Sequence, residues 1–382
     1  MNMKIDDAFI KREFPLDNDI AYLNHAAVAP WPKRTSEAVK LFADENIRTG
    51  AQFYETWLYR ESELRLQLQR LINAPSVGDI ALLKNTSEAI SVVACGLRWQ
   101  GGENIVSTDE EFPSNRIPWQ AQCKSGVEFR EINILHSDDP EFALINACDE
   151  KTRVLTVSSV QYGSGIRLDL QRLGEFCSTN NILFCVDAIQ SIGAHQIDVQ
   201  AIQADFVMAD GHKWMLGPEG IALFYCNPEI RDQLELRQYG WRMIQDAGNY
   251  DMKEWRPSID AKRFECGSPN MLGIHALSAS LSLFEEIGME KIERSILMNT
   301  AYLLEKLSNF PGIEILTPGD ERRHAGIVTF KIAGQDPREL HTNLLNEKVI
   351  CARRCEGIRF SPHFYTGRNI IDKALDIIDV II

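Results

Sequence analysis

The most informative segment of the chain is Ala204-Asp-Phe-Val-Met-Ala-Asp-Gly-His-Lys-Trp-Met-Leu-Gly-Pro-Glu-Gly220. Its apolar run at 206–209 predicts a buried strand, and a second apolar run at 221–225 follows the glycines. Lys213 stands just past the first strand. An amine in that position is partly desolvated, which favours its neutral, nucleophilic form. Lys213 is therefore a candidate Schiff-base lysine.

An aspartate upstream strengthens this interpretation. Asp187 ends an apolar run in Phe184-Cys-Val-Asp-Ala-Ile-Gln-Ser191, and a buried carboxylate without a partner is costly. A protonated pyridine nitrogen is a suitable partner, so Asp187 and Lys213 supply the two protein groups that a pyridoxal phosphate site requires. Gln190 could hydrogen-bond the ring hydroxyl. The alternative is a structural aspartate that caps a loop.

Composition narrows the class of protein. The chain has 382 residues, 45% hydrophobic and 25% charged, as in an ordinary globular enzyme. Its net charge of −14 argues against a nucleic-acid or anionic-membrane surface. No apolar run reaches transmembrane length, and residues 1–8 lack the apolar core of a signal peptide. The nine scattered cysteines form no Cys-x-x-Cys pair, so we expect reduced cytoplasmic thiols and no metal site.

Short, continuously apolar runs recur along the chain with helical or polar segments between them. They predict strands at 80–83, 104–107, 154–157, 182–186, 206–209 and 221–225. Such strands indicate an α/β fold in which helices cover both faces of a mostly parallel sheet. We expect this large domain to span residues 20–285. Residues 286–382 predict a smaller α+β domain, ending in a helix at 369–382, and we expect residues 1–19 to pack on it.

Candidate ligand-binding residues follow the carboxyl ends of these strands, where parallel sheets bind ligands. Each of five strands is followed by one or two of them: Thr86 and Ser87, Phe112, Gln161 and Tyr162, Asp187, and Lys213. Thr86 and Ser87 also begin a predicted helix, whose free N–H groups make a phosphate seat. The alternative there is an ordinary helix N-cap.

Three further side chains have two interpretations each. Phe112 could stack on the cofactor ring or simply pack in the core. His212, beside Lys213, could reach the phosphate or the ring, or be a loop histidine with local partners. Arg359 presents a fork that suits a substrate α-carboxylate, or it is a surface arginine.

The combined motifs resemble the class V aminotransferase family of pyridoxal phosphate enzymes, which has fold type I. Within it, the chain resembles the branch of cysteine desulfurases, cysteine C–S lyases, kynureninase and isopenicillin N epimerase. The resemblance runs from Tyr22 to Tyr365 and rests on the following segments: Val186-Asp-Ala-Ile-Gln-Ser191, Asp210-Gly-His-Lys-Trp214, Gly217-Pro-Glu-Gly220, Asn85-Thr-Ser-Glu-Ala89, Arg263-Phe-Glu-Cys-Gly-Ser-Pro-Asn270 and Arg359-Phe-Ser-Pro-His363.

The resemblance implies a role for each matching residue. Lys213 would carry the cofactor, Asp187 would bind the pyridine nitrogen and Gln190 the ring oxygen. The remaining roles are phosphate binding by Thr86, Ser87 and His212, ring stacking by Phe112, and carboxylate binding by Arg359. We add Gln161 as a cofactor-binding candidate, and Asn24 and His25 as substrate-binding candidates. The family is dimeric, and the 267–270 loop, with Ser268, would reach the partner's cofactor.

Three departures from the desulfurases stand out. The residue that would stack on the ring is Phe112 where they use histidine, and Asp210 stands where they have serine. The segment 349–359 runs almost directly into Arg359, which leaves no room for the long loop that carries their persulfide cysteine. Cys351 and Cys355 lie in this segment, and we interpret both as packing thiols.

These observations predict a homodimeric enzyme that acts on a small amino acid and uses Lys213 as the base at the α-carbon. The family name favours a class V aminotransferase-like activity. The alternatives are a cysteine or cystine C–S lyase or desulfurase, an amino-acid epimerase, and a binding protein that keeps the fold without turnover.

Overall fold

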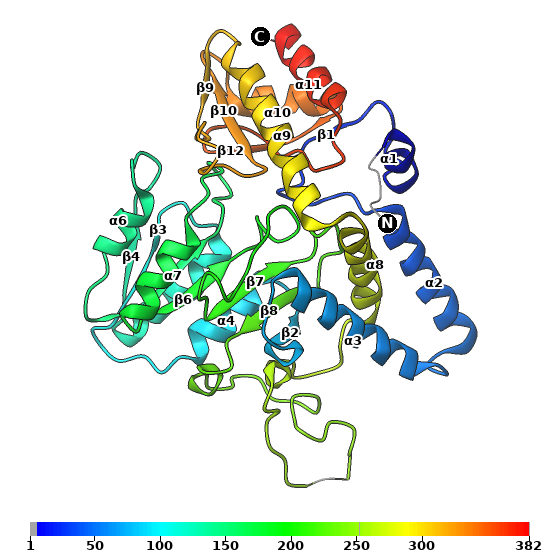
Figure 1. Cartoon of the computed structure of the whole chain (residues 1–382), viewed down its shortest axis with the longest axis vertical. Helices are drawn as coiled ribbons and strands as arrows, with labels where there is room; N and C mark the ends of the chain where they lie inside the picture. The colour runs from blue at the N-terminus through cyan, green and yellow to red at the C-terminus, as the bar shows by residue number, and fades with distance from the viewer. Residues whose placement is uncertain (1–5, 252, 382) are drawn as a thin grey trace.

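The computed structural model describes residues 6–251 and 253–381. A seven-stranded sheet has the order β2-β8-β7-β6-β5-β3-β4 (Figure 1). Its strands are β2 (Ile80–Leu83), β3 (Asn104–Thr108), β4 (Glu128–Ile132), β5 (Thr152–Ser158), β6 (Leu183–Asp187), β7 (Phe206–Asp210) and β8 (Ala222–Cys226). Only β8 runs antiparallel to its neighbours in this sheet. The predicted α/β class with a mostly parallel sheet is confirmed.

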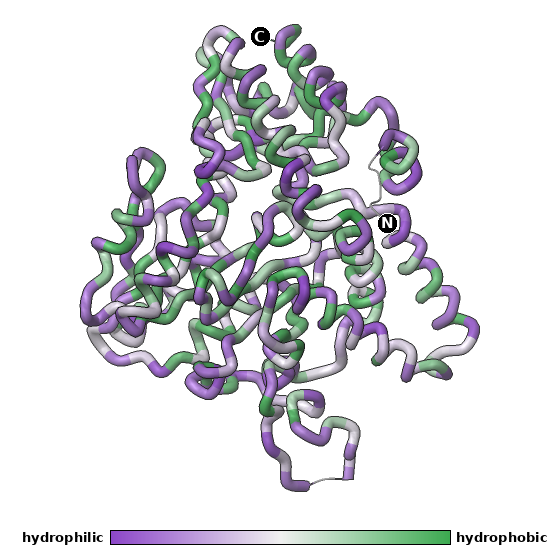
Figure 2. Tube along the Cα trace, in the orientation of Figure 1, coloured by the Kyte–Doolittle hydropathy of each residue, from purple (hydrophilic) through white to green (hydrophobic). Residues whose placement is uncertain are grey.

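Helices cover both faces of this sheet. One apolar cluster joins it to α3, α7 and α8, and a second joins the other face to α4. The helices that belong to this larger unit are α2 (Lys33–Thr49), α3 (Tyr54–Leu71), α4 (Thr86–Gly96), α5 (Ile117–Gln120), α6 (Pro140–Asn146), α7 (Leu170–Thr179) and α8 (Met271–Ile287). Hydrophilic and hydrophobic residues alternate along α2 (Figure 2), which packs one face on α8.

A smaller unit with its own apolar cluster lies beyond α8 (Figure 1). Its four-stranded sheet has the order β12-β13-β10-β9, and β1 pairs with β11 beside it. Its elements are β1 (Ala21–Tyr22), α9 (Met289–Ser308), β9 (Ile313–Ile315), β10 (Val328–Ile332), α10 (Pro337–Asn346), β11 (Val349–Ile350), β12 (Ala352–Arg354), β13 (Gly357–Phe360) and α11 (Arg368–Ile381). Helix α1 (Asp7–Glu13) instead joins the apolar cluster of the larger unit through Phe9. Among the described residues, none of the helices combines the length and apolar character needed to cross a membrane.

The domain boundaries at 20, 285 and 286 remain predictions. Phe14 stacks on Tyr365 with ring centroids 3.6 Å apart, so the segment after α1 contacts the C-terminal part of the chain. Residues 1–5 of the segment predicted to pack there, and Ile382 at the end of the last predicted helix, lie outside the described residues. Strand β4 was not predicted because its residues are polar and half-exposed at the sheet edge.

Candidate active site

A cavity of about 290 Å³ opens at the carboxyl ends of the central strands, where β13 of the smaller unit approaches the sheet. Both units line it, with Ala26, Ala27, Asn85, Thr86, Ser87, Phe112, Ser114, Tyr162, Asp187, Ile189, Gln190, Asp210, His212, Lys213, Arg354 and Arg359. Most of the predicted site residues therefore meet in one place. Five strands of the same direction, β2, β3, β5, β6 and β7, precede most of these residues, and their carboxyl ends share one edge of the sheet.

Lys213 and Asp187 are two of the buried ionisable groups that line this cavity, 8% and 1% exposed. Asp187 ends β6, and its Oδ1 accepts a hydrogen bond from the Ile189 N–H at 3.0 Å. Burial raises the pKa of Asp187, and the buried Glu111 nearby adds to the rise. Burial, together with the Arg359 guanidinium, lowers the pKa of Lys213. The site thus favours a neutral amine and leaves the carboxylate in need of a cation.

Gln190 is held from two sides. Its Nε2 donates to the Ala26 carbonyl at 3.1 Å, and its Oε1 accepts from Trp214 Nε1 at 2.8 Å. Trp214 is fully buried next to Lys213, and its carbonyl lies 3.1 Å from His363 Nε2. A Cβ added to Gly326 would stand 2.3 Å from the Trp214 ring, so the indole fills its slot completely. One Gln190 N–H remains available to the cavity.

The candidate phosphate seat combines the start of α4 with the loop after β7. Asn85 Oδ1 accepts from the Glu88 N–H at 2.8 Å and caps α4, while other first-turn N–H groups have no intrahelical partner. His212 Nδ1 lies 3.0 Å from Asp210 Oδ1, and the Asp210 N–H donates to Thr86 Oγ1 at 3.2 Å. His212 and Asp210 are thus neighbours whose facing atoms make no hydrogen bond, and the Asp210 N–H ties the loop after β7 to the start of α4.

Phe112 stands at the mouth of the cavity with 39% of its surface exposed. Its ring meets that of Tyr162 edge-on, with centroids 5.1 Å apart, and Lys213 Nζ lies 5.6 Å from the Phe112 ring centroid. A planar group linked to Lys213 would therefore lie within reach of the Phe112 ring. The predicted stacking role remains a prediction.

Arg359 is a fully buried cation with unused donors. Its Nη1 donates to the Tyr162 carbonyl at 2.7 Å, while its Nε and Nη2 are buried and without a hydrogen-bond partner among the described residues. Burial and the neighbouring Arg354 lower the pKa of Arg359 to about 9. Because an unpaired buried charge is costly, the guanidinium is suited to receive a carboxylate.

Arg354 was missed in the sequence. Its guanidinium lies 6.0 Å from the Tyr162 ring centroid, at the edge of the same cavity. The signal was available, because a two-residue turn between two short strands brings positions 354 and 359 to one hairpin. Recognising it required knowing that β12 pairs with β13, and β12 has too few apolar residues to be predicted as a strand.

Four predicted residues lie outside the cavity lining. Gln161 is fully buried and its Nε2 donates to Glu111 Oε1 at 3.3 Å. The two ring nitrogens of His25 lie 2.8 Å from the Ser361 carbonyl and 2.7 Å from the Tyr365 hydroxyl. Asn24 forms a bridge with Ser361, and Ser268 is exposed in its loop. Their predicted roles in binding remain predictions.

The turn between β12 and β13 consists of Cys355 and Glu356 alone, with φ angles of 49° and 53°. Two residues with positive φ make the tightest kind of hairpin connection. Cys355 lies at its tip and Cys351 is buried, where burial raises its pKa to about 12. Neither cysteine lines the cavity.

A family model described as aminotransferase class-V matches residues 21–365. The chain belongs to the class-V aminotransferase family. Among its class-V relatives, the probable cysteine desulfurase of Methanothermobacter thermautotrophicus is 33% identical over 92% of this chain and 87% of that protein. The probable cysteine desulfurase of Pyrococcus abyssi is 29% identical, covering 98% of this chain and 97% of that one.

Solved structures of class-V proteins share the fold. The apo cysteine desulfurase from Thermococcus onnurineus has a TM-score of 0.88 and 25% identity, covering 100% of this chain and 99% of that one. The cystine C–S lyase C-DES, in complex with cysteine persulfide, has a TM-score of 0.90 and 23% identity, covering 96% and 99% of the two chains. The latter likeness concerns the fold alone.

Pyridoxal phosphate is the cofactor of this class-V family, and the cavity fits it. Asp187 forms no ion pair within the described part of the chain, the Lys213 amine is desolvated, and one helix N-terminus lines the cavity with His212 beside it. These are the groups that a pyridine nitrogen, an aldehyde and a phosphate require. Lys213, Asp187, Gln190, Thr86, Ser87 and His212 would hold the cofactor.

Proposed function

We propose that this protein is a pyridoxal phosphate enzyme that cleaves the C–S bond of cysteine or cystine. The supporting observation is a cavity that combines the desolvated Lys213 amine with two guanidinium groups, Arg359 and Arg354. The sequence favours an aminotransferase-like activity, whereas relatives named cysteine desulfurase support the C–S-cleaving alternative.

The arginines define how a substrate would be held. Arg359 offers Nε and Nη2 to the α-carboxylate, since Nη1 is already used by the Tyr162 carbonyl. Arg354, on the same hairpin, lies where a second carboxylate would be bound. Cystine carries two amino-acid ends and cysteine one, so we propose that Arg354 favours cystine.

Lys213 would move the protons. When bound, pyridoxal phosphate supplies an aldehyde that captures the amine and a ring that stabilises negative charge at the α-carbon. Lys213, as a neutral amine, would take the α-proton, and Asp187 would supply the negative charge that a protonated ring nitrogen requires. Loss of sulfur from the β-carbon, with one water consumed, would give pyruvate and ammonia together with hydrogen sulfide from cysteine or cysteine persulfide from cystine.

A homodimer is part of this proposal. Large hydrophobic side chains are exposed on residues 235–251 and 253–260, which project from the body of the molecule (Figure 1): Tyr239, Trp241, Tyr250, Trp255 and Ile259. Exposed apolar clusters of this kind mark interaction surfaces. The exposed 267–270 loop adjoins this segment in sequence, which supports its proposed reach to the partner's cofactor.

The test is a substrate screen with purified holoenzyme. Cysteine, cystine, alanine and other amino acids are assayed for pyruvate, other keto acids, sulfide, persulfide and inverted stereochemistry. We expect pyruvate and reduced sulfur from cystine or cysteine. Keto acid from a sulfur-free amino acid, with no sulfur release, would favour transamination, and no turnover with any amino acid would favour a binding protein.

A further inference from the structure

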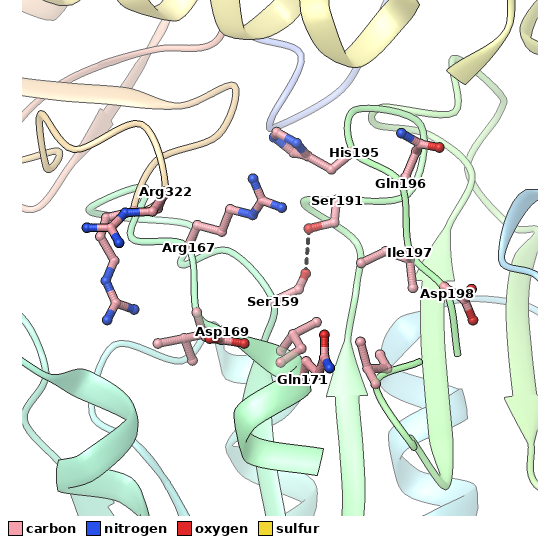
Figure 3. Close-up of a pocket in the computed structure, with 14 residues that line it drawn as sticks. Ser159, Arg167, Asp169, Gln171, Ser191, His195, Gln196, Ile197, Asp198 and Arg322 are labelled. Atoms are coloured by element: carbon pink, nitrogen blue, oxygen red, sulfur yellow. Dashed lines mark hydrogen bonds between the residues drawn. The ribbon is translucent and has the colours of Figure 1, made fainter. Parts of the chain in front are cut away.

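A second cavity has a volume of about 460 Å³, and Figure 3 shows the residues that line it. It is bounded by the ends of β5 and β6, the start of α7 and residues 322–323 of the smaller unit. It shares a wall with the first cavity, because the Ser159 N–H donates to the Asp187 carbonyl at 2.9 Å. The Ser159 and Ser191 hydroxyls, 2.7 Å apart, form that wall.

His195 gives this cavity an unused nitrogen. The side chain is 2% exposed, and its Nδ1 lies 3.1 Å from Glu293 Oε1. Because an ionised Glu293 can only accept, Nδ1 carries the hydrogen and Nε2 of the neutral ring is a lone pair. Nε2 has no hydrogen-bond partner among residues 6–251 and 253–381. Buried polar nitrogens rarely lack a hydrogen-bond partner, so we expect a ligand to hydrogen-bond to His195 Nε2.

Arg167 gives the cavity an unpaired cation. Its partly buried side chain extends toward His195 and Ser191 (Figure 3), and no carboxylate in the described part of the chain forms an ion pair with it. The other two lining arginines are neutralised. Arg323 pairs with Glu141 at 2.6 Å, and Arg322 pairs with Asp320 at 2.8 Å.

The two carboxylates that line the cavity are also engaged. Asp169 caps α7 by accepting from the Arg172 N–H at 3.1 Å. Asp198 accepts from the Gln200 and Ala201 N–H groups, both at 3.0 Å. They lower the local positive potential without pairing with Arg167. One cation without an ion-pair partner and one histidine nitrogen without a hydrogen-bond partner, as far as the described residues go, thus face the same cavity.

We propose that this cavity binds a small oxyanion on Arg167 and that binding places a proton on His195 Nε2. A neutral Nε2 directs a lone pair at the anion, whereas a protonated one donates a hydrogen bond to it. Glu293, on the other side of the ring, stabilises the resulting imidazolium. The ligand class is a small carboxylate or a tetrahedral oxyanion, since both match a guanidinium fork.

The sign of the pH dependence follows from the groups around His195. Burial lowers the pKa of the unliganded His195, although Glu293 opposes this, and Arg167 and His324 add to the lowering. A bound anion offsets Arg167 and raises the pKa of His195. Anion binding therefore takes up a proton, and affinity falls by about tenfold for each unit of rising pH between the lowered pKa of the free ring and the raised pKa of the liganded ring.

The experiment is calorimetric titration of the holoenzyme with sulfate and, separately, with succinate. Neither probe titrates above pH 7, and buffers of different ionisation enthalpy report the protons taken up. We expect saturable binding with uptake of about one proton per anion. Absence of binding by both probes, or binding without proton uptake, overturns the proposal. Preference between the probes identifies the ligand class.

Variants assign the binding to this cavity. Arg167→Ala should weaken it by about tenfold or more, because a charge-assisted hydrogen bond is lost. Arg322→Ala is the matched control, since it removes an arginine whose side chain is 88% exposed at the rim. His195→Gln should bind without proton uptake. Retained cofactor absorption shows that each variant is folded.

The Arg359→Ala variant tests whether the anion binds in this cavity or in the candidate active site, because the Arg359 guanidinium could also bind an anion. Binding that persists in Arg359→Ala and is lost in Arg167→Ala supports the proposal. The reverse pattern places the anion in the active site and overturns it. The outcome is independent of which amino acid the enzyme cleaves.

Discussion

Lys213 is placed so that its own surroundings set when it can react. Burial and the nearby Arg359 both lower its pKa, whereas Asp187 and Asp210 oppose the shift. A lysine whose pKa is depressed is neutral over a wider range of pH than an exposed lysine, which titrates at about 10.4. The structure thus activates the amine before any substrate arrives.

We predict that covalent uptake of pyridoxal phosphate by the apoprotein speeds up with rising pH, with a midpoint well below about 10.4. The reason is that only the neutral Lys213 amine attacks the aldehyde. Stopped-flow absorption gives the midpoint, and borohydride reduction with peptide mapping places the label. Arg359→Ala should move the midpoint upward, because a neighbouring positive charge is removed. Labelling of another lysine would contradict the prediction that Lys213 carries the cofactor.

Arg359 carries the second prediction at this scale. Arg359→Lys should raise the apparent KM for the best substrate by about tenfold or more, because one ammonium cannot replace two guanidinium nitrogens. The matched control is Arg353→Lys, next to Arg354 but not part of the cavity lining. Steady-state kinetics with equal KM for both variants would exclude Arg359 from carboxylate binding.

The β12–β13 hairpin limits how sulfur could leave in the proposed C–S cleavage. A turn of two residues holds Cys355 at a fixed distance, and a mobile cysteine would need a longer segment, at roughly 3.3–3.6 Å per extended residue. Cys351 is buried with its pKa raised to about 12, so little thiolate forms near neutral pH. Sulfur should therefore leave as a free product.

We predict that a Cys351→Ser, Cys355→Ser double variant releases sulfur from cystine or cysteine at a rate close to that of the wild type. Sulfide and persulfide assays, with cofactor absorption as the folding control, measure it. Loss of sulfur release with normal cofactor binding would mean that an enzyme thiol accepts the sulfur after all.

A buried ion cluster ties the edge strand β2 to α3. Arg65, 3% exposed, pairs with Glu61 at 2.6 Å and with Glu265 at 2.7 Å. Glu265 also accepts from the Leu82 N–H at 2.8 Å, which covers the open edge of β2. The cluster fixes the segment that leads into the 267–270 loop.

Arg65→Met should lower the free energy of unfolding by about 3 kcal/mol, because Glu61 and Glu265 lose a buried cation and Arg242 alone is left to both. Arg98→Met is the control. The Arg98 side chain is 82% exposed in its pair with Glu235, so its loss should change stability by about 1 kcal/mol or less. Urea denaturation measures both, and equal effects would contradict the argument.

The sequence predicted these elements unevenly, for physical reasons. The buried strands carry continuous apolar runs, so β2, β3, β5, β6, β7 and β8 were all predicted within a few residues. The edge strand β4 and the short strands β9 and β12 carry no such run, because most of their side chains are exposed or only half-buried. Asp187 was found because it ends a strand and Lys213 because it follows one closely. The position of Arg354 depends on the pairing of two short strands, which the periodicity of the sequence does not reveal.

At the scale of the whole molecule, the projecting residues 235–251 and 253–260 expose large apolar side chains, which is unusual for a protein that stays monomeric. Tyr250 is 78% exposed and Trp255 51%. We predict that the holoenzyme is a dimer and that Tyr250→Asp with Trp255→Asp weakens the dimer. Sedimentation velocity across a range of concentrations measures it. A wild type that is monomeric at all concentrations would contradict both this and the shared active site.

Trp214 is an intrinsic fluorescent reporter of cofactor binding. The indole is fully buried, hydrogen-bonded to Gln190 and adjacent in sequence to Lys213. Its ultraviolet emission overlaps the absorption of a pyridoxyl chromophore, so energy transfer should quench it whenever the cofactor is in place. Because Gly326 and His363 of the smaller unit hold the same ring, its emission would also register any movement of that unit against the sheet.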